Sequence, residues 1–321
     1  MQCMDMHAAR LSKSSGLLAA KWEPGYRVHW RYADEGFAVA DWCCSGTGSS
    51  APTAEVTRHF EINLQRRGWH VRSFARRRFF IDPLHHSLWP ADSGFGLSNN
   101  VAQPQAATLL FVALDAVEEV LASIGGASTA AFRKLRTVPA HWRSNELTAC
   151  HARLLATDCN DRLAVEEHSL ALIRRVVGEA AGSSEIDDLC TSSRRLAAID
   201  TARSYILSRY REQLSLSSIA ASCGAAPSTL CESFPRVVGM PVWKYVQRLR
   251  LQEAALALAE GAEDLSGLAL DLGFSSHSHF AQAFRTHFGA PPSHFRRPMG
   301  QAAPAHPAPA AFARPCAAAS A

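Results

Sequence analysis

Phenylalanines recur at every fourth position in the stretch GFSSHSHFAQAFRTHFG, near the C-terminal end of the chain. Phe280, Phe284 and Phe288 therefore predict a helix with one buried stripe. The other side of this helix is polar and carries His277, His279, Gln282, Arg285 and His287. A metal ion, a substrate and a nucleic acid are each compatible with such a face.

A small residue followed four positions later by a glycine precedes this helix, and the same spacing occurs about fifty residues upstream. Ala269 to Gly273 and Ala220 to Gly224 are the two instances. Each lies between two short apolar helices, which is the pattern of a helix-turn-helix unit. The residues between the units read as one long helix ended by Gly261. Two units in tandem are a specific signal, and we place this domain at residues 198–297.

The upstream unit also carries capping signals. Ser215 or Ser217 is expected to cap its first helix, and Pro227 fits the first turn of its second helix. Leu230 and Phe234 then form the buried stripe of that second helix.

Short β-like runs separated by Gly, Pro, Asn and Asp dominate residues 26 to 114. They include YRVHWRYA, FAVADWCC, HFEINLQRRG, WHVRSFA, RRFFIDP and ATLLFVAL. Repeated short strands with turn signals predict a sandwich or a small barrel.

A helical pattern follows, and we expect a helical hairpin over residues 126–180. Its first helix has a stripe of Leu147, His151, Leu154 and Leu155, and its second a stripe of Leu163, Leu170, Ile173, Val176 and Val177. Such stripes either pack on their own domain or pair with a second chain, and the sequence leaves both readings open. A Gly, Ser and acid-rich stretch predicts a linker at 181–197. Residues 1–18 are expected to be an N-terminal tail, and 298–321 a disordered Pro and Ala-rich tail.

Composition narrows the choice of compartment and partners. The net charge is only +4, so any binding to nucleic acid has to come from a local face. Nine scattered cysteines without a C-x-x-C pair, and no apolar run of membrane-spanning length, favour a cytoplasmic protein with no membrane partner. We expect no cofactor and no metal.

Five segments of the last third resemble the DNA-binding domain of AraC/XylS-type transcriptional regulators. They are SLSSIAASCG, PSTLCESF, VGMPVWKYVQRLRLQEAALAL, LSGLALDLGFSSHSHFAQAF and HFGAPPSHFR. The resemblance implies that a connecting helix holds two helix-turn-helix units, each of which offers a recognition helix to one major groove. On one face of B-DNA these grooves are roughly 34 Å apart. The implied partners are double-stranded promoter DNA and, for an activator, RNA polymerase; the implied function is regulatory, not enzymatic.

The polar side of each recognition helix supplies the residues expected to face DNA. In the second unit they are Ser276, His277, His279, Gln282 and Arg285, and in the first they are Ser228, Thr229, Glu232 and Arg236. Arginine matches guanine O6 and N7, and glutamine matches adenine. A metal site is disfavoured, because His277 and His279 are two positions apart on a helix and diverge.

The first unit departs from the family pattern at two positions. Glu232 stands where the family usually has a basic residue, and Pro235 falls late in the recognition helix. A carboxylate facing phosphates weakens binding, and proline inside a helix costs about 3 kcal/mol unless the helix ends near Phe234. We therefore expect the first unit to read few bases and the second unit to carry the specificity.

Residues 58–99 are similar to the cupin-like sensing domains that precede this DNA-binding domain in many AraC-type regulators. The similarity depends on RRG, the IDP turn and the rhythm of the strands. It implies a cupin-like effector-sensing β-barrel at 19–125, with the hairpin mediating a homodimer. The fold class is then multidomain α+β, with an all-α C-terminal domain. His59, Trp42, Trp69 and Trp89 are candidate contacts to a small-molecule effector, although each also suits a place in the core.

Two other functions remain open at this point. One is an orphan regulator whose barrel only dimerises or docks a partner. The other is a cupin-type metalloenzyme fused to a DNA-binding domain, which needs converging His and carboxylate ligands. The barrel region has no H-x-H pair, and this disfavours the enzyme.

Overall fold

A computed structural model describes residues 26–46, 53–56, 59–74, 77–91, 93–99, 104–123, 140–182 and 193–296. The expected tails at 1–18 and 298–321 lie outside these ranges. Both ends of the linker expected at 181–197 are helical, and residues 183–192 between them are not described.

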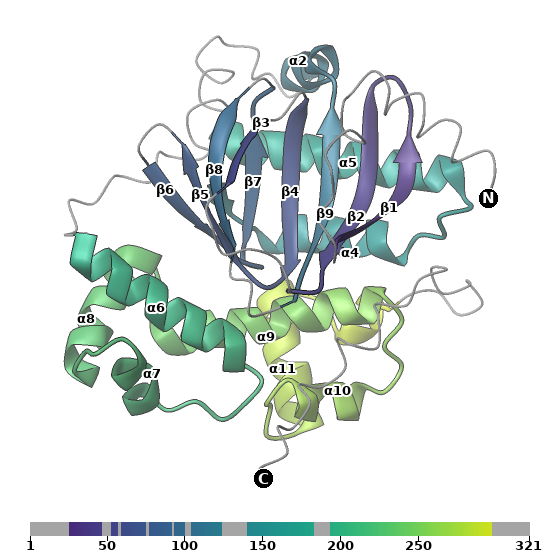
Figure 1. Cartoon of the computed structure of the whole chain (residues 1–321). Coiled ribbons are helices and arrows are strands. Elements are labelled where there is room, and N and C mark those ends of the chain that lie inside the picture. The colour runs from purple at the N-terminus through teal and green to yellow at the C-terminus, as the bar shows by residue number, and fades with distance from the viewer. Residues whose placement is uncertain are drawn as a thin grey trace.

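Two antiparallel sheets form the N-terminal part of the molecule (Figure 1). The six-stranded sheet has the order β1 (Tyr26–Ala33), β2 (Phe37–Cys44), β9 (Gln105–Val112), β4 (Phe60–Arg67), β7 (His85–Trp89) and β10 (Ala140–Trp142). The four-stranded sheet has the order β3 (Thr53–Val56), β8 (Gly94–Asn99), β5 (His70–Phe74) and β6 (Arg77–Ile81). The six runs expected to be strands correspond to β1, β2, β4, β5, β6 and β9, so those predictions are confirmed.

The expected closed β-barrel is wrong. Among the described residues, strand pairing joins the strands into two separate sheets and not into one closed ring. Strand β10 also pairs with β7, although the sequence pattern assigned its residues to the helical segment. Local alternation predicts a strand but not its partner, because pairing depends on segments that are distant in sequence.

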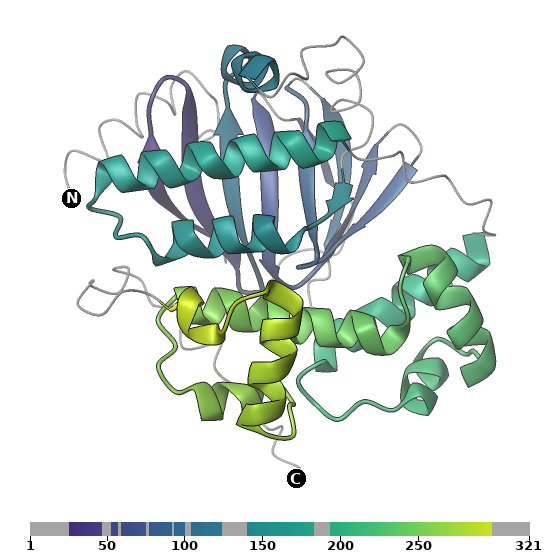
Figure 2. The ribbon, with the colours of Figure 1, turned by 180° about the vertical axis from the view of Figure 1, so that it is seen from behind.

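Helices cover the outer face of the six-stranded sheet (Figure 2). They are α4 (Asn145–Ala156) and α5 (Arg162–Gly182), and α2 (Leu114–Ser123) lies at the edge of the sheet next to α5. Phe60, Ile62 and Leu64 of β4 are buried in one core cluster with residues of these helices. Their neighbours in sequence alternate to the other face, as the period of a strand requires.

The stripe expected on α5 is partly wrong. Leu163 and Leu170 are exposed, with relative solvent accessibilities of 75% and 44%. Val165, Leu172 and Val176 are instead buried against the sheet. At 100° per residue, Leu163 and Leu170 share a face opposite Val165. The sequence contains two apolar faces, and only the tertiary structure selects the one that packs.

The C-terminal part is helical. It consists of α6 (Ser193–Arg209), α7 (Leu216–Ser222), α8 (Pro227–Val238), α9 (Val242–Ala259), α10 (Leu265–Asp271), α11 (His277–Phe288) and the 3-10 turn η1 (Pro292–Phe295). Ser215 caps α7 through a capping box, and Pro227 is the first residue of α8, as expected. Gly273, in the turn before α11, has φ +78°, and a Cβ there would lie 2.5 Å from the Arg211 carbonyl oxygen. Only glycine fits this position.

The two parts of the molecule share a hydrophobic core. Val71, Phe80 and Leu84 of the sheet region belong to the same buried cluster as Ile199 and Ile206 of α6. In the described part of the chain, no helix has the length and hydrophobicity needed to cross a membrane.

Candidate nucleic-acid interface

Helix α11 is fixed to its domain by the phenylalanine stripe. Phe280 and Phe284 are fully buried, and their rings meet edge to face at 5.6 Å. Ser276 caps the helix, because its hydroxyl oxygen accepts a hydrogen bond from the His279 backbone N–H. That oxygen therefore has a structural role at the start of the helix.

The opposite side of α11 is open to solvent. His277, His279, Gln282 and Arg285 are all exposed, as the sequence pattern predicts. Ser278 and Thr286 are exposed beside them, although the pattern did not single them out. The His279 ring lies 3.0 Å from the Ser275 hydroxyl and edge-on to Phe274, so its orientation is constrained.

Helix α8 presents the corresponding face of the first unit. Ser228, Thr229, Glu232 and Arg236 are exposed, while Leu230 and Phe234 are fully buried. Glu232 forms an ion pair with Arg236, one turn later on the same helix, at 2.8 Å. The carboxylate on this face is thus locally paired with a cation.

Helix α8 does not end near Phe234. The helix continues through Pro235 to Val238 and is ended by Gly239, with φ +76°. Pro235 has no N–H to donate to the carbonyl one turn back, so α8 lacks one helical hydrogen bond in its interior. Burial of Phe234 and Val238 on the same helix supplies the packing that keeps the last turn helical.

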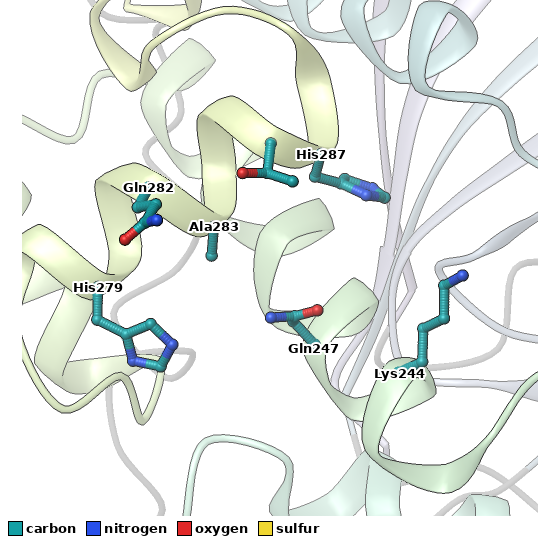
Figure 3. A pocket seen from close by; sticks show the side chains of 7 residues that line it. Lys244, Gln247, His279, Gln282, Ala283 and His287 are labelled. Atoms are coloured by element: carbon teal, nitrogen blue, oxygen red, sulfur yellow. The ribbon is translucent and has the colours of Figure 1, made fainter.

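A groove of about 540 Å³ runs between α9 and α11 (Figure 3). It is lined by Lys244 and Gln247 of α9 and by His279, Gln282, Ala283, Thr286 and His287 of α11. Burial lowers the pKa of His287 to about 4, and Arg248 and Lys244 nearby contribute. The His287 ring is therefore neutral at pH 7, and Lys244 supplies the positive charge in this groove.

Lys244 and Gln247 are candidate contact residues that the sequence analysis missed. The sequence pattern predicted only one long connecting helix here. The helical spacing could have identified them, because Tyr245 and Leu249 form the buried side of α9 and leave Lys244 and Gln247 nearer to solvent. What the sequence did not supply is the adjacency of that face to α11.

The three candidate effector tryptophans have different surroundings. Trp89 is fully buried between the sheets, near Phe95, with the Arg72 guanidinium 4.6 Å from its ring centre. Trp42 packs against a different cluster, around Leu109 on β9. Trp69 stacks on Phe80 at 4.8 Å and joins the core shared with the helical domain.

His59 directly precedes β4 and is half-buried. Within the described ranges, no group of three or more His, Cys, Asp or Glu side chains is arranged to hold a metal ion. A carboxylate and a histidine of the sheet domain have protein partners: Glu61 pairs with Arg72 at 2.9 Å, and His85 bonds Asp82 at 2.7 Å.

Comparison with known proteins identifies the helical domain. Residues 219–298 match the family model described as a helix-turn-helix domain. The HTH-type transcriptional activator AarP of Providencia stuartii is 36% identical over 84 residues, which cover 26% of this chain and 62% of that protein. The HTH-type transcriptional activator RhaS of Enterobacter sp. (strain 638) is 26% identical over 171 residues, or 50% of this chain and 58% of that protein. This chain thus spans less than two thirds of either relative.

One solved structure is similar to part of this chain. The transcriptional regulator from Chromobacterium violaceum, described as having an AraC-type DNA-binding domain, is 30% identical and covers 31% of this chain and 88% of its own, with a TM-score of 0.30. Residues 219–298 of this chain form a helix-turn-helix domain, in agreement with the resemblance of this segment to AraC/XylS-type regulators.

Proposed function

We propose that the whole protein is a sequence-specific transcriptional regulator that reads double-stranded promoter DNA. The observation that carries this proposal is the exposed polar face of α11, anchored from behind by Phe280 and Phe284. Gln282 and Arg285 are the residues of this face best suited to read base edges. Helix α8 would enter the neighbouring major groove, roughly one helical turn away.

The groove between α9 and α11 supports separate roles for residues that read bases and residues that contact the DNA backbone. Lys244 and Gln247 lie next to the reading face and offer an ammonium group and an amide. Groups of this kind contact phosphate oxygens without reading sequence. We propose that they hold the DNA strand that passes beside α11.

The first experiment is selection of duplexes from a random pool by the purified full-length protein at stated salt concentrations. We expect enrichment of one or two short blocks, about 10 bp apart if both units read bases. One enriched block would agree with specificity carried mainly by α11. Folded protein that enriches no motif at any salt concentration would contradict the proposed function.

We also propose that the N-terminal domain is a cupin-like sensing domain and that a small-molecule effector changes DNA binding. The support is the hydrophobic core shared by the sheets and α6, because a change in one domain then alters the packing of the other. An effector acts only through different affinities for two arrangements of the protein. A metabolite that raises the melting temperature of the full-length protein but leaves its DNA affinity unchanged would contradict gating by that metabolite.

A homodimer through α5 is the corresponding proposal for assembly. Leu163 and Leu170 form the exposed apolar face of this helix, on the side away from the sheet. Sedimentation of the wild type and of a Leu163→Glu, Leu170→Glu variant tests it. A wild-type monomer at micromolar concentration, or a dimer unchanged by both charges, would exclude this interface.

A further inference from the structure

The N-terminal domain contacts each helix-turn-helix unit at a different place. One contact joins the turn between β6 and β7 to α6 and the start of α9, next to the first unit. Another joins α4 to the end of α9 and to α11, in the second unit. Figures 1 and 2 show the sheets and α4 directly above α9, with the two units on either side below.

Asp82 is the centre of the first contact. Its side chain is fully buried, and one carboxylate oxygen accepts hydrogen bonds from Arg203 of α6 and from the Tyr245 hydroxyl of α9, both at 2.6 Å. The other oxygen accepts from the Leu84 backbone N–H at 2.8 Å and lies 2.7 Å from the Nδ1 atom of His85. One buried side chain thus joins a turn of the sheet domain to two helices that are 121 and 163 residues away in sequence.

The two partners of Asp82 each contact an aromatic ring, and one of these rings belongs to the first recognition helix. The Arg203 guanidinium lies 3.9 Å from the ring centre of Phe80 of the sheet domain. The Tyr245 ring meets Phe234 of α8 edge to face at 5.5 Å. Phe234 is the fully buried residue that anchors α8, so two side chains connect Asp82 to the recognition helix.

The second contact has different chemistry. Thr148 of α4 donates a hydrogen bond to Gln252 of α9 at 2.8 Å, and the Asn145 amide donates to the His287 carbonyl of α11. Ala152 and Leu155 of α4 share a small buried cluster with Leu256 and Ala259 of α9.

The end of β4 also contacts the second half of α9 and the residue that follows this helix. Arg67 pairs with Glu253 at 3.1 Å, and Arg66 pairs with Glu260 at 2.8 Å. Helix α9 is therefore held along its length by the N-terminal domain.

We propose that the N-terminal domain acts as a splint that sets the relative placement of α8 and α11, with Asp82 as the positioning residue for α8. This proposal depends on the proposed DNA-binding function for its biological meaning. A charged pair with full hydrogen bonding in a buried site fixes geometry more strictly than apolar packing alone, since each partner loses its hydrogen bonds when it moves. Loosening this contact should leave each recognition helix intact but relax the distance between the two.

Asp82→Asn is the first test variant, and Glu61→Gln is its matched control. Both changes convert a buried, arginine-paired carboxylate of the sheet domain into an amide, but Glu61 pairs with Arg72 inside that domain. Tyr245→Phe is a milder second variant, because it removes one hydrogen bond to Asp82 and keeps the ring against Phe234.

If selection enriches two blocks, the DNA measurement uses duplexes that carry both, with their spacing changed in single base-pair steps around about 10 bp. If selection enriches one block, the hydrogen-exchange experiment below decides. We expect Asp82→Asn and Tyr245→Phe to bind the altered spacings nearly as well as the preferred one. Their preference should fall about fivefold or more relative to wild type, while Glu61→Gln keeps it. General destabilisation lowers binding to all spacings alike, so an unchanged spacing preference in folded Asp82→Asn would overturn the proposal.

Hydrogen exchange of the free protein tests the splint without DNA. In Asp82→Asn we expect faster exchange in α6, α8 and the first half of α9, with α10 and α11 unchanged. Unchanged exchange in α8, or an equal increase in α11, would contradict the positioning role. Because this readout needs no operator, it separates failure of the splint from failure of the proposed DNA-binding function.

Discussion

At the scale of single residues, the interface combines side chains that suit base edges with side chains that suit phosphates. Arg285 and Gln282 belong to the first kind, and Lys244 belongs to the second. Glu232 belongs to neither, because its charge is already paired with Arg236 on the same helix. The three groups predict different behaviour in binding experiments.

Arg285→Ala should lose sequence discrimination, because a bidentate arginine contact to guanine contributes about 1–3 kcal/mol. Glu232→Ala should change discrimination much less and leave the enriched motif intact. Selection from a random pool, repeated with both variants, measures the difference. Comparable losses would contradict the assignment of specificity to α11.

Lys244→Ala should weaken binding to all sequences by a similar factor, because it removes a phosphate contact and no base contact. The slope of log affinity against log salt concentration should become shallower by about one unit. Lys244→Arg keeps the charge and serves as the control. A changed motif with an unchanged salt slope would show that Lys244 reads bases instead.

At the scale of elements, α8 is the helix in which local sequence and tertiary packing disagree. Pro235 lies in its interior, yet the burial of Phe234 and Val238 keeps the helix continuous to Gly239. Pro227, at the first position of the same helix, costs no hydrogen bond. The two prolines therefore provide an internal comparison.

Pro235→Ala should raise the free energy of unfolding by about 2 kcal/mol. The estimate sets the helix-interior cost of proline, about 3 kcal/mol, against the lower entropy that proline gives the unfolded chain. Pro227→Ala should have no stabilising effect. Urea unfolding of both variants tests this, and no gain for Pro235→Ala would mean that α8 has adapted fully to its proline.

At the scale of the whole molecule, several histidines are buried as neutral rings, and they connect stability to pH. Burial holds the pKa values of His70, His86 and His151 well below the usual range. For His151, Arg143, Arg66 and Arg31 nearby lower the pKa further. The His151 side chain points from α4 to the sheet, where its Nε2 atom lies 2.9 Å from the Thr108 hydroxyl.

Acid should therefore destabilise the fold. In the unfolded chain these rings take up protons below a pKa of about 6.5, whereas the folded chain resists protonation, so unfolding binds protons. The free energy of unfolding should fall as pH decreases below about 6.5, by at most about 1.4 kcal/mol per pH unit for each ring. Urea unfolding at several pH values measures the slope. His151→Gln should make it shallower, the exposed His277→Gln should not, and equal slopes in all three proteins would contradict the assignment.

The sequence alone determined the helix-turn-helix domain, because its signals are local. Helical periodicity, a capping serine, the glycine turns and the connecting helix all act within a few residues of one another. The exposed residues of α8 and α11 followed from the same periodicity. Six of the strands were also predictable, since alternation and turn residues are local features as well.

The tertiary structure decided everything that depends on contacts between distant segments. It chose which of two apolar faces of α5 is buried, left the strands as two sheets, kept α8 helical through Pro235 and placed Lys244 beside α11. It also brought Asp82 to Arg203 and Tyr245, across 121 and 163 residues. No local pattern encodes such a contact, because its stability comes from burial and hydrogen bonds that exist only once the whole chain has folded.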